Sequence, residues 1–143
     1  MRLADGGRSN FDEMTGDFRN LKVWIKAHAL ALHVDRVAPS IRATRHTSLK
    51  SQLVRAAMSI PANIAEGRRQ ESDKNFARFL GYSVNSAYEL EYHLVVGKDM
   101  MAIAEDEANS MLAECVEVRK MLHGLLKTLS KGSSTKPKRQ NSP

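Results

Sequence analysis

Apolar residues recur at alternating spacings of four and three in four separate stretches of this chain. This spacing places each set along one face of an α-helix, because residues three and four apart are neighbours on a helix surface. The stretches predict helices over residues 19–41, 49–67, 72–100 and 105–130. With short connections and no alternating strand pattern, these helices form an antiparallel up-down-up-down four-helix bundle, so the predicted fold class is all-α. We expect Met101 to close the third apolar seam, although Gly97 favours an end or a bend of the helix before it.

The second predicted helix is the most distinctive, because it carries polar residues and a proline among small and apolar ones. Pro61 cannot donate to the carbonyl of Ala57, so we expect a kink there. Gly67 offers a place for the helix to end. A bundle helix needs only one buried face, which leaves a second, polar face available for an interface. That face comprises Gln52, Arg55, Ser59, Asn63 and Glu66.

The same helix carries a family resemblance. The run SIPANIAEG, preceded by QLVRAA and followed by FARFL, resembles the signature of small bacterial four-helix-bundle proteins first noted as products of intervening sequences within 23S rRNA genes. The resemblance extends from FRNLKVW, which begins at Phe18, to KMLHGLLKTL, which ends at Leu129. The chain departs from the family at Arg45, where an acidic residue is common, and at residues 83–86, where the family has a small Ala-x-Gly-Ser segment.

This family is similar in turn to the accessory variability determinant of diversity-generating retroelements. The resemblance implies a homo-oligomer, because members of both groups are pentameric bundles that form a barrel. It also implies that such a protein can hold nucleic acid for a reverse transcriptase, which would then be a partner.

Length and composition limit the domain organisation and the location of the protein. A chain of 143 residues is long enough for one domain with a sizeable core. We expect a flexible segment over residues 1–17, the bundle over 18–130 and a disordered basic tail over 131–143, which is rich in Gly, Ser, Pro and Lys. The chain lacks a membrane-length apolar run and a secretory signal, and its lone cysteine excludes an internal disulfide. These features predict a cytoplasmic protein without a membrane partner.

The formal charge of +6 is unevenly distributed along the chain. Residues 36–78 contain nine Lys and Arg against three acidic residues, whereas residues 79–126 contain three basic against eight acidic ones. Residues 127–143 add five basic residues and no acidic one. This pattern is compatible with nucleic-acid binding. It is equally compatible with docking of basic onto acidic faces between subunits, and the charge pattern alone leaves both hypotheses open.

Two basic sets are candidates for contacts with phosphate. Arg42, Arg45 and Lys50 lie around the start of the second helix, and the other set, from Arg68 to Arg78, follows its end. The two sets lie at opposite ends of the second helix if the bundle is antiparallel. The candidate nucleic-acid-binding residues are Arg42, Arg45, Lys50, Arg55, Arg68, Arg69, Lys74 and Arg78. The alternative is an ordinary solvated helix end, with the arginines paired to Glu71 and Asp73. Few aromatic residues interleave with these cations, so the sequence gives little support for stacking on single-stranded bases and none for base-specific readout.

The sequence offers no convincing catalytic set. Ser86, Glu89 and His93 share a stripe on the third helix, but Ser86 and His93 are two turns apart, about 10 Å by helical rise. Proton transfer between them needs about 3 Å. Cys115 lies on the fourth apolar seam and is expected to be a small buried residue. The histidines lack metal-ligand spacing and no glycine-rich nucleotide loop occurs. We therefore predict no catalytic, cofactor or metal site and interpret the protein as not an enzyme.

The polar stripes are better explained by structure. We predict a structural hydrogen-bond network or a subunit interface, with ligand or water binding as the alternative. The residues of this set are Ser59, Asn63, Glu66, Ser86 and Glu89.

Three functional hypotheses follow. The leading one is a non-enzymatic oligomeric bundle that binds structured RNA or DNA without marked sequence specificity, as an accessory to a reverse transcriptase. The second is a protein-interaction scaffold whose charges serve assembly only. The third is a hydrolase or transferase, which would require a cavity shared by Glu66 and Glu89.

Overall fold

The computed structural model describes residues 16–134, and their regular structure is helical throughout. Two short 3-10 helices, η1 (Phe18–Asn20) and η2 (Ala38–Ser40), flank the first long helix, α2 (Lys22–Val37). The other long helices are α3 (Ala43–Arg68), α4 (Asp73–Asp99) and α5 (Glu105–Ser134). The described residues contain no strand, which confirms the predicted all-α class with four helices. None of these helices is long and apolar enough to cross a membrane.

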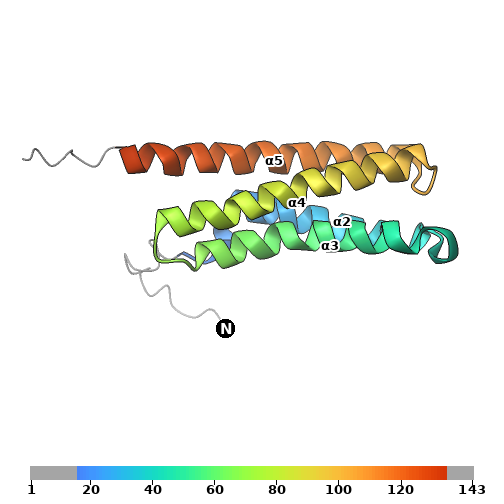
Figure 1. Ribbon diagram of the computed structural model, residues 1–143, viewed down its shortest axis with the longest axis horizontal. Coiled ribbons are helices and arrows are strands. Elements are labelled where there is room, and N and C mark those ends of the chain that lie inside the picture. Colours follow the sequence, from blue (N-terminus) through green and yellow to red (C-terminus); the bar gives the residue numbers. More distant parts are fainter. Residues whose placement is uncertain (1–15, 135–143) are drawn as a thin grey trace, which may run out of the picture.

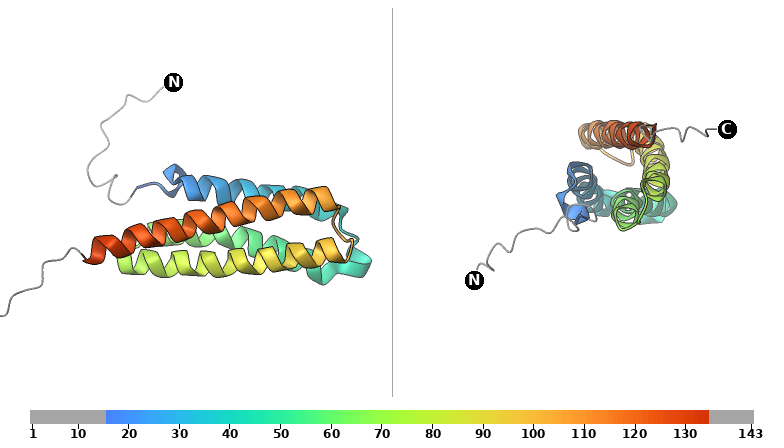
Figure 2. Two further views of the ribbon diagram at one scale, coloured as in Figure 1. Left: turned by 90° about the horizontal axis from the view of Figure 1, so that it is seen from above. Right: turned by 90° about the vertical axis from the view of Figure 1, so that its left-hand side faces the viewer.

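The four long helices run antiparallel to their neighbours in chain order (Figure 1). Each packs on the next one, and α5 also packs on α2, so that the helices surround a common core (Figure 2). The start of α2, the α3–α4 connection and the C-terminal end of α5 therefore lie at one end of the bundle (Figure 1). The α2–α3 and α4–α5 connections lie at the other end.

The predicted apolar seams form this core. On α3, the seam residues Leu53, Ala57, Ile60 and Ile64 are at most 1% exposed. Full burial of a leucine or isoleucine side chain contributes about 1.5–3 kcal/mol, so these seams supply most of the favourable free energy of folding. At the edge of the core, seam positions on the other helices are only partly buried, namely Val37, Leu125 and Leu129.

Helix α3 begins six residues earlier than the sequence predicts, at Ala43 and not at residue 49. His46 has non-helical dihedral angles, φ −129° and ψ 31°, so the helix has a local break shortly before the predicted start at residue 49. Pro61 lies inside α3, and the departure from helical dihedral angles falls at His46 and not at the proline, where we expected a kink. Pro39, by contrast, lies in η2 directly after α2, as expected for a residue that ends a helix.

Gly67 brings α3 and α4 together and does not end α3. The helix continues to Arg68, and its C-cap Arg69 has right-handed dihedral angles, so no left-handed glycine cap is formed. A Cβ atom at position 67 would lie 2.7 Å from Cβ of Phe79 and 3.0 Å from Cδ2 of Phe76. The absence of a side chain therefore allows the first turns of α4 to pack directly on the backbone of α3.

The third seam ends before Met101, which is 89% exposed, so its predicted place in the core is wrong. Helix α4 ends at Asp99, and Met101 adopts a positive φ of 57° in the following turn. The amides of Ala102 and Ile103 then donate to the carbonyl of Gly97, at 2.9 and 3.1 Å. A Cβ at Gly97 would lie 2.6 Å from Cδ1 of Ile103. Ile103 therefore occupies the core position that the spacing had assigned to Met101.

Candidate nucleic-acid interface

The basic set at the α3–α4 connection is held by the ends of two helices. Ser72 caps α4 by accepting a hydrogen bond from the amide of Asn75 at 3.1 Å, which fixes where the helix starts. Lys74 and Arg78 follow on the first turns of α4, and both are exposed. The guanidinium of Arg78 lies 5.5 Å from the ring centre of Phe79. This contact orients a charge that remains open to solvent.

The α3 side of this set contributes two arginines in different surroundings. Arg69 is exposed. Arg68 is half-buried: its Nε donates to the carbonyl of Gly16 at 3.3 Å, and its guanidinium lies 5.9 Å from the ring centre of Phe76. Arg68 therefore has a packing role as well as a charge.

The alternative interpretation paired the arginines of this end with Glu71 and Asp73. Across residues 16–134, no ion pair involves Arg69, Lys74 or Arg78. Their charges are therefore available to a partner that carries phosphate.

Sequence reasoning missed two further cations at this end of the bundle. Lys127 and Lys131 lie on the last turns of α5, which reach the same end as the α3–α4 connection (Figure 1). The sequence shows five basic residues after position 126, which could have indicated these two lysines. Only the antiparallel arrangement of the helices shows that they lie at the same end as the basic residues of the α3–α4 connection. Helix α5 continues to Ser134, four residues past the predicted limit of the bundle, and the rest of the predicted tail lies outside the described residues.

The other candidate cations do not join this set. Arg42 is exposed and Lys50 half-buried at the opposite end, and the side chain of Arg45 lies outside the part of the chain that the structure describes. Arg55 lies midway along α3, where its Nη2 is 2.5 Å from Oε1 of Glu89 and 2.8 Å from Oε1 of Gln52. The structure thus places Arg55 with the polar residues and not with either basic end.

Several residues of the predicted polar network meet along the line between α3 and α4. The hydroxyl oxygens of Ser59 and Ser86 are 2.5 Å apart, and the Ser59 hydroxyl lies 3.0 Å from the carbonyl of Ala56. Asn63 donates through Nδ2 to the carbonyl of Ser59 at 2.9 Å. The sequence did not predict the nearby bond in which the buried hydroxyl of Ser83 donates to the carbonyl of Ile60 at 2.8 Å. The Ser59–Ser86 and Ser83–Ile60 bonds connect the middle of α3 to α4, whereas the other two bonds lie within α3.

Glu66 lies apart from this group. It is exposed near the end of α3, whereas Glu89 contacts Arg55, which is about 16 Å from Glu66 by helical rise. The structure therefore does not bring Glu66 and Glu89 into one cavity, as the hydrolase or transferase hypothesis would need.

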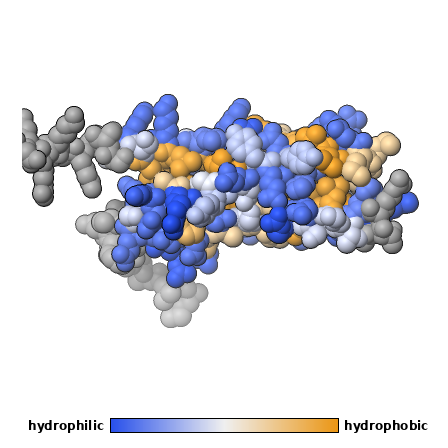
Figure 3. Space-filling model, in the orientation of Figure 1, coloured by the Kyte–Doolittle hydropathy of each residue, from blue (hydrophilic) through white to orange (hydrophobic). Residues whose placement is uncertain are grey.

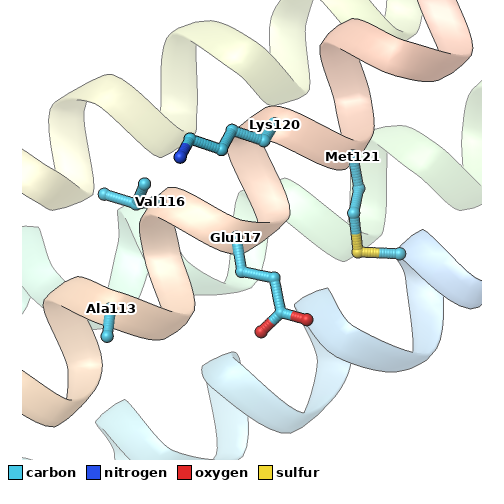
Figure 4. Close-up of a pocket in the computed structure, with 5 residues that line it drawn as sticks. All are labelled: Ala113, Val116, Glu117, Lys120 and Met121. Carbon is cyan, nitrogen blue, oxygen red and sulfur yellow. The ribbon is translucent and has the colours of Figure 1, made fainter.

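The stripe on α4 that suggested a Ser–His–acid set is used for other contacts. Ser86 bonds to Ser59, and His93 lies 3.6 Å from Glu89 one turn away on the same helix. No group of three or more metal-ligating side chains occurs within residues 16–134. A hollow of about 450 Å³ on α5 contains no residue of the predicted sites and is lined by Ala113, Val116, Glu117, Lys120 and Met121 (Figure 4).

Three titratable groups of the described residues have shifted pKa values. The hydrogen bond from the backbone amide of Arg19 lowers the pKa of the exposed Asp17, and the other two groups lie within the bundle. Burial raises the pKa of the Cys115 thiol to about 12, and its Sγ lies 3.2 Å from the carbonyl of Ala87, so this cysteine is a buried thiol in the core. His33 of α2 lies between two carboxylates of α5, with Nδ1 2.5 Å from Glu114 and Nε2 3.0 Å from Glu107. Burial lowers the pKa of His33, but the hydrogen bonds and charges of Glu114 and Glu107 more than offset this, and the net pKa is raised.

Comparison with known proteins identifies the family. Residues 19–124 match the family described as 23S rRNA-intervening sequence protein. No curated protein matches the sequence. Among solved structures, the fold is similar to that of a protein of unknown function from the S23 ribosomal protein family of Bacteroides thetaiotaomicron VPI-5482, with a TM-score of 0.69 and 23% identity over 73% of this chain and 98% of that chain. Because the family match spans well over half of its residues, this chain belongs to the 23S rRNA-intervening sequence protein family.

Proposed function

We propose that this protein is a homo-oligomeric helical bundle that binds structured RNA or DNA through the basic end formed by the α3–α4 connection and the last turns of α5. One observation carries the proposal: Arg69, Lys74 and Arg78 are exposed and form no ion pair within residues 16–134, although acidic residues are close in sequence. Lys127 of α5 is exposed at the same end.

The chemistry of this end favours phosphate over bases. Exposed lysines and arginines gain affinity by releasing counterions from the nucleic-acid backbone, which carries no information about sequence. The cations project from helix ends and a connection, so no single row of side chains is arranged to enter a groove and read base edges. We therefore propose binding without marked sequence specificity.

Self-association is the second part of the proposal. Ile25 and Leu32 lie seven residues apart on one face of α2 and are 51% and 42% exposed, and Met58 of α3 is 41% exposed. Large apolar side chains at such positions support an interface between subunits. The subunit number we propose is five, arranged as a barrel, on the strength of the family resemblance. The same resemblance makes a reverse transcriptase the partner class to test.

The rival function is an interaction scaffold whose charges serve assembly alone. The Arg55–Glu89 pair removes one candidate cation from phosphate binding, because this side chain is already paired inside one subunit. The two hypotheses differ in what happens when the basic end is neutralised. In the scaffold, this change alters assembly, whereas in our proposal it alters nucleic-acid binding and leaves assembly intact.

The test is the salt dependence of binding to a DNA hairpin. Replacing Arg69, Lys74 and Arg78 together by Gln should weaken binding and reduce the slope of log K against log salt by about 2 to 3, because each lost phosphate contact removes about 0.9. Arg36→Gln is the matched control, since Arg36 is exposed on α2 away from this set. An unchanged slope in the triple variant contradicts the assignment.

A further inference from the structure

The three tyrosines of the chain, Tyr82, Tyr88 and Tyr92, all lie on α4 and all are exposed. Tyr88 and Tyr92 are one turn apart and therefore share a face, with 49% and 65% of their surfaces exposed. Tyr92 is the more open ring, with His93 as its described ring neighbour at 5.6 Å between centroids. An aromatic side chain this exposed leaves most of its apolar surface in water, which marks the face as a candidate binding surface.

A row of basic side chains on α5 lies on the side of that helix next to Tyr88. Lys120, His123 and Lys127 follow one another at spacings of three and four and are exposed. Lys120 points toward α4, whereas Glu117 and Met121 point toward α2 (Figure 4). Within residues 16–134, neither Lys120 nor Lys127 forms an ion pair.

Contacts between the two helices place Tyr88 at the level of Arg119 and His123. The guanidinium of Arg119 lies 4.8 Å from the ring centre of Tyr88, and the ring of His123 lies 6.4 Å from it, edge to face. Arg119 also donates through Nε to Glu91 at 3.2 Å, which neutralises the acidic group of α4 nearest to this row. Figure 3 views the molecule from this side, with hydrophobic side chains towards both ends of the line between α4 and α5 and more hydrophilic ones between and around them.

We propose that this α4–α5 face binds single-stranded nucleic acid, with bases stacked on Tyr92 and Tyr88 and phosphates held by Lys120 and Lys127. Stacking on aromatic side chains beside a basic row is how proteins hold unpaired bases without sequence preference. The two tyrosines are about 6 Å apart along α4 by helical rise, whereas stacked bases in a duplex strand rise 3.4 Å. Neighbouring bases must separate to reach both rings, which favours a single strand over a duplex.

This inference goes beyond the proposed function. It shares Lys127 with the basic end but uses neither Arg69, Lys74 nor Arg78, the three residues whose replacement tests that function. The two can therefore fail separately. This surface was not predicted from the sequence, because the aromatic residues and the basic residues that form it come from two different helices.

The test compares an oligothymidylate with the DNA hairpin as ligands of the full chain. Tyr92→Ala should weaken oligothymidylate binding by about ten- to one-hundred-fold and leave hairpin binding unchanged, because stacking acts on unpaired bases. Tyr92→Phe, which keeps the aromatic ring, should bind oligothymidylate with an affinity within about threefold of that of the unmodified protein. Tyr82→Ala is the matched control, since Tyr82 is 45% exposed but contacts Phe79 and not α5.

Three outcomes would each overturn the inference. The first is that the unmodified protein fails to bind oligothymidylate, and the second is that Tyr92→Ala binds it as well as the unmodified protein does. The third is that Tyr82→Ala loses as much affinity as Tyr92→Ala. A fall in light-scattering mass caused by Tyr92→Ala would assign the face to a second copy of this chain instead. Loss of hairpin binding in the triple variant of Arg69, Lys74 and Arg78, with oligothymidylate binding kept, would support both surfaces.

Discussion

Gly67 and Gly124 are both helical glycines of this bundle, but the missing side chain has a different consequence at each position. A Cβ at Gly67 would lie 2.7 Å from Cβ of Phe79, which is part of a rigid helix contact, whereas a Cβ at Gly124 meets nothing within 4 Å. At Gly67 the missing side chain is needed for packing. At Gly124 it only costs helix propensity.

Alanine substitutions at these two glycines should therefore change stability in opposite directions. Gly67→Ala should lower the free energy of unfolding by about 1–3 kcal/mol, because the added methyl overpacks the α3–α4 contact. Gly124→Ala should raise it by about 0.5–1 kcal/mol. Urea denaturation of both variants is the measurement, and equal shifts in one direction would contradict the assigned role of Gly67.

His33 is the clearest titratable contact between α2 and α5. Carboxylates only accept hydrogen bonds, so an imidazole that contacts Glu114 and Glu107 through its two ring nitrogens must carry a proton on each. Its raised folded-state pKa means that protonated His33 stabilises the fold. This contribution is fully present below the unfolded-state pKa of about 6.5 and is lost as the pH rises through the folded-state value.

The pH dependence of stability tests this contact. The difference in unfolding free energy between the unmodified protein and His33→Gln should be largest below about pH 6.5 and should shrink as the pH rises. Urea denaturation over a pH series gives the difference, and His123→Gln serves as an exposed control. A difference that grows with pH would show that His33 is held in its neutral form.

At the scale of whole helices, buried hydrogen bonds connect the middle of α3 to α4. Ser83 is fully buried, and its hydroxyl donates to the carbonyl of Ile60, one residue before the proline that removes a donor from α3. The Ser59–Ser86 contact lies close by but is only partly buried. The helix pair therefore contains polar bonds inside an otherwise apolar contact.

Ser83→Ala should lower the free energy of unfolding by about 1 kcal/mol, because the substitution removes a buried hydrogen bond without creating a large cavity. Ser51→Ala, an exposed position on α3, should change stability by less than about 0.5 kcal/mol. Thermal or urea denaturation distinguishes the two. Equal effects at both positions would mean that the Ser83 hydroxyl has no net stabilising role.

Helix periodicity explains which features the sequence predicts well. The seam from Leu53 to Ile64 is buried as predicted, because spacing along one helix decides which of its faces meets the core. The end of α4 was misjudged because the seam spacing continues to Met101, while the packing of Ile103 on Gly97 decides where the chain turns. Such packing depends on residues beyond the helix and has no periodic signal.

The contacts of His33 and Tyr88 with residues of other helices were not predicted. His33 meets Glu107 and Glu114, and Tyr88 meets Arg119 and His123, only because of how each helix is rotated and shifted against its neighbour. Spacing within one helix contains no information about that register. The cations of the α3–α4 connection were found from sequence because they are close together in the chain.

At the scale of the whole molecule, charge is separated along the bundle. Residues 79–126 contain eight acidic against three basic residues, whereas the α3–α4 connection and the C-terminal turns of α5 gather cations at one end. This arrangement supports electrostatic attraction of a polyanion to that end. The apolar side chains of Ile25 and Leu32 lie on α2, so assembly and nucleic-acid binding need not use the same residues.

The most direct test of this account is the light-scattering mass of the purified protein, with and without a structured RNA, across a salt series. We predict an oligomer whose mass rises by that of bound RNA at low salt and returns to the mass of the protein alone at high salt. A stable oligomer whose mass never changes with RNA at any salt concentration would contradict the account and favour the scaffold.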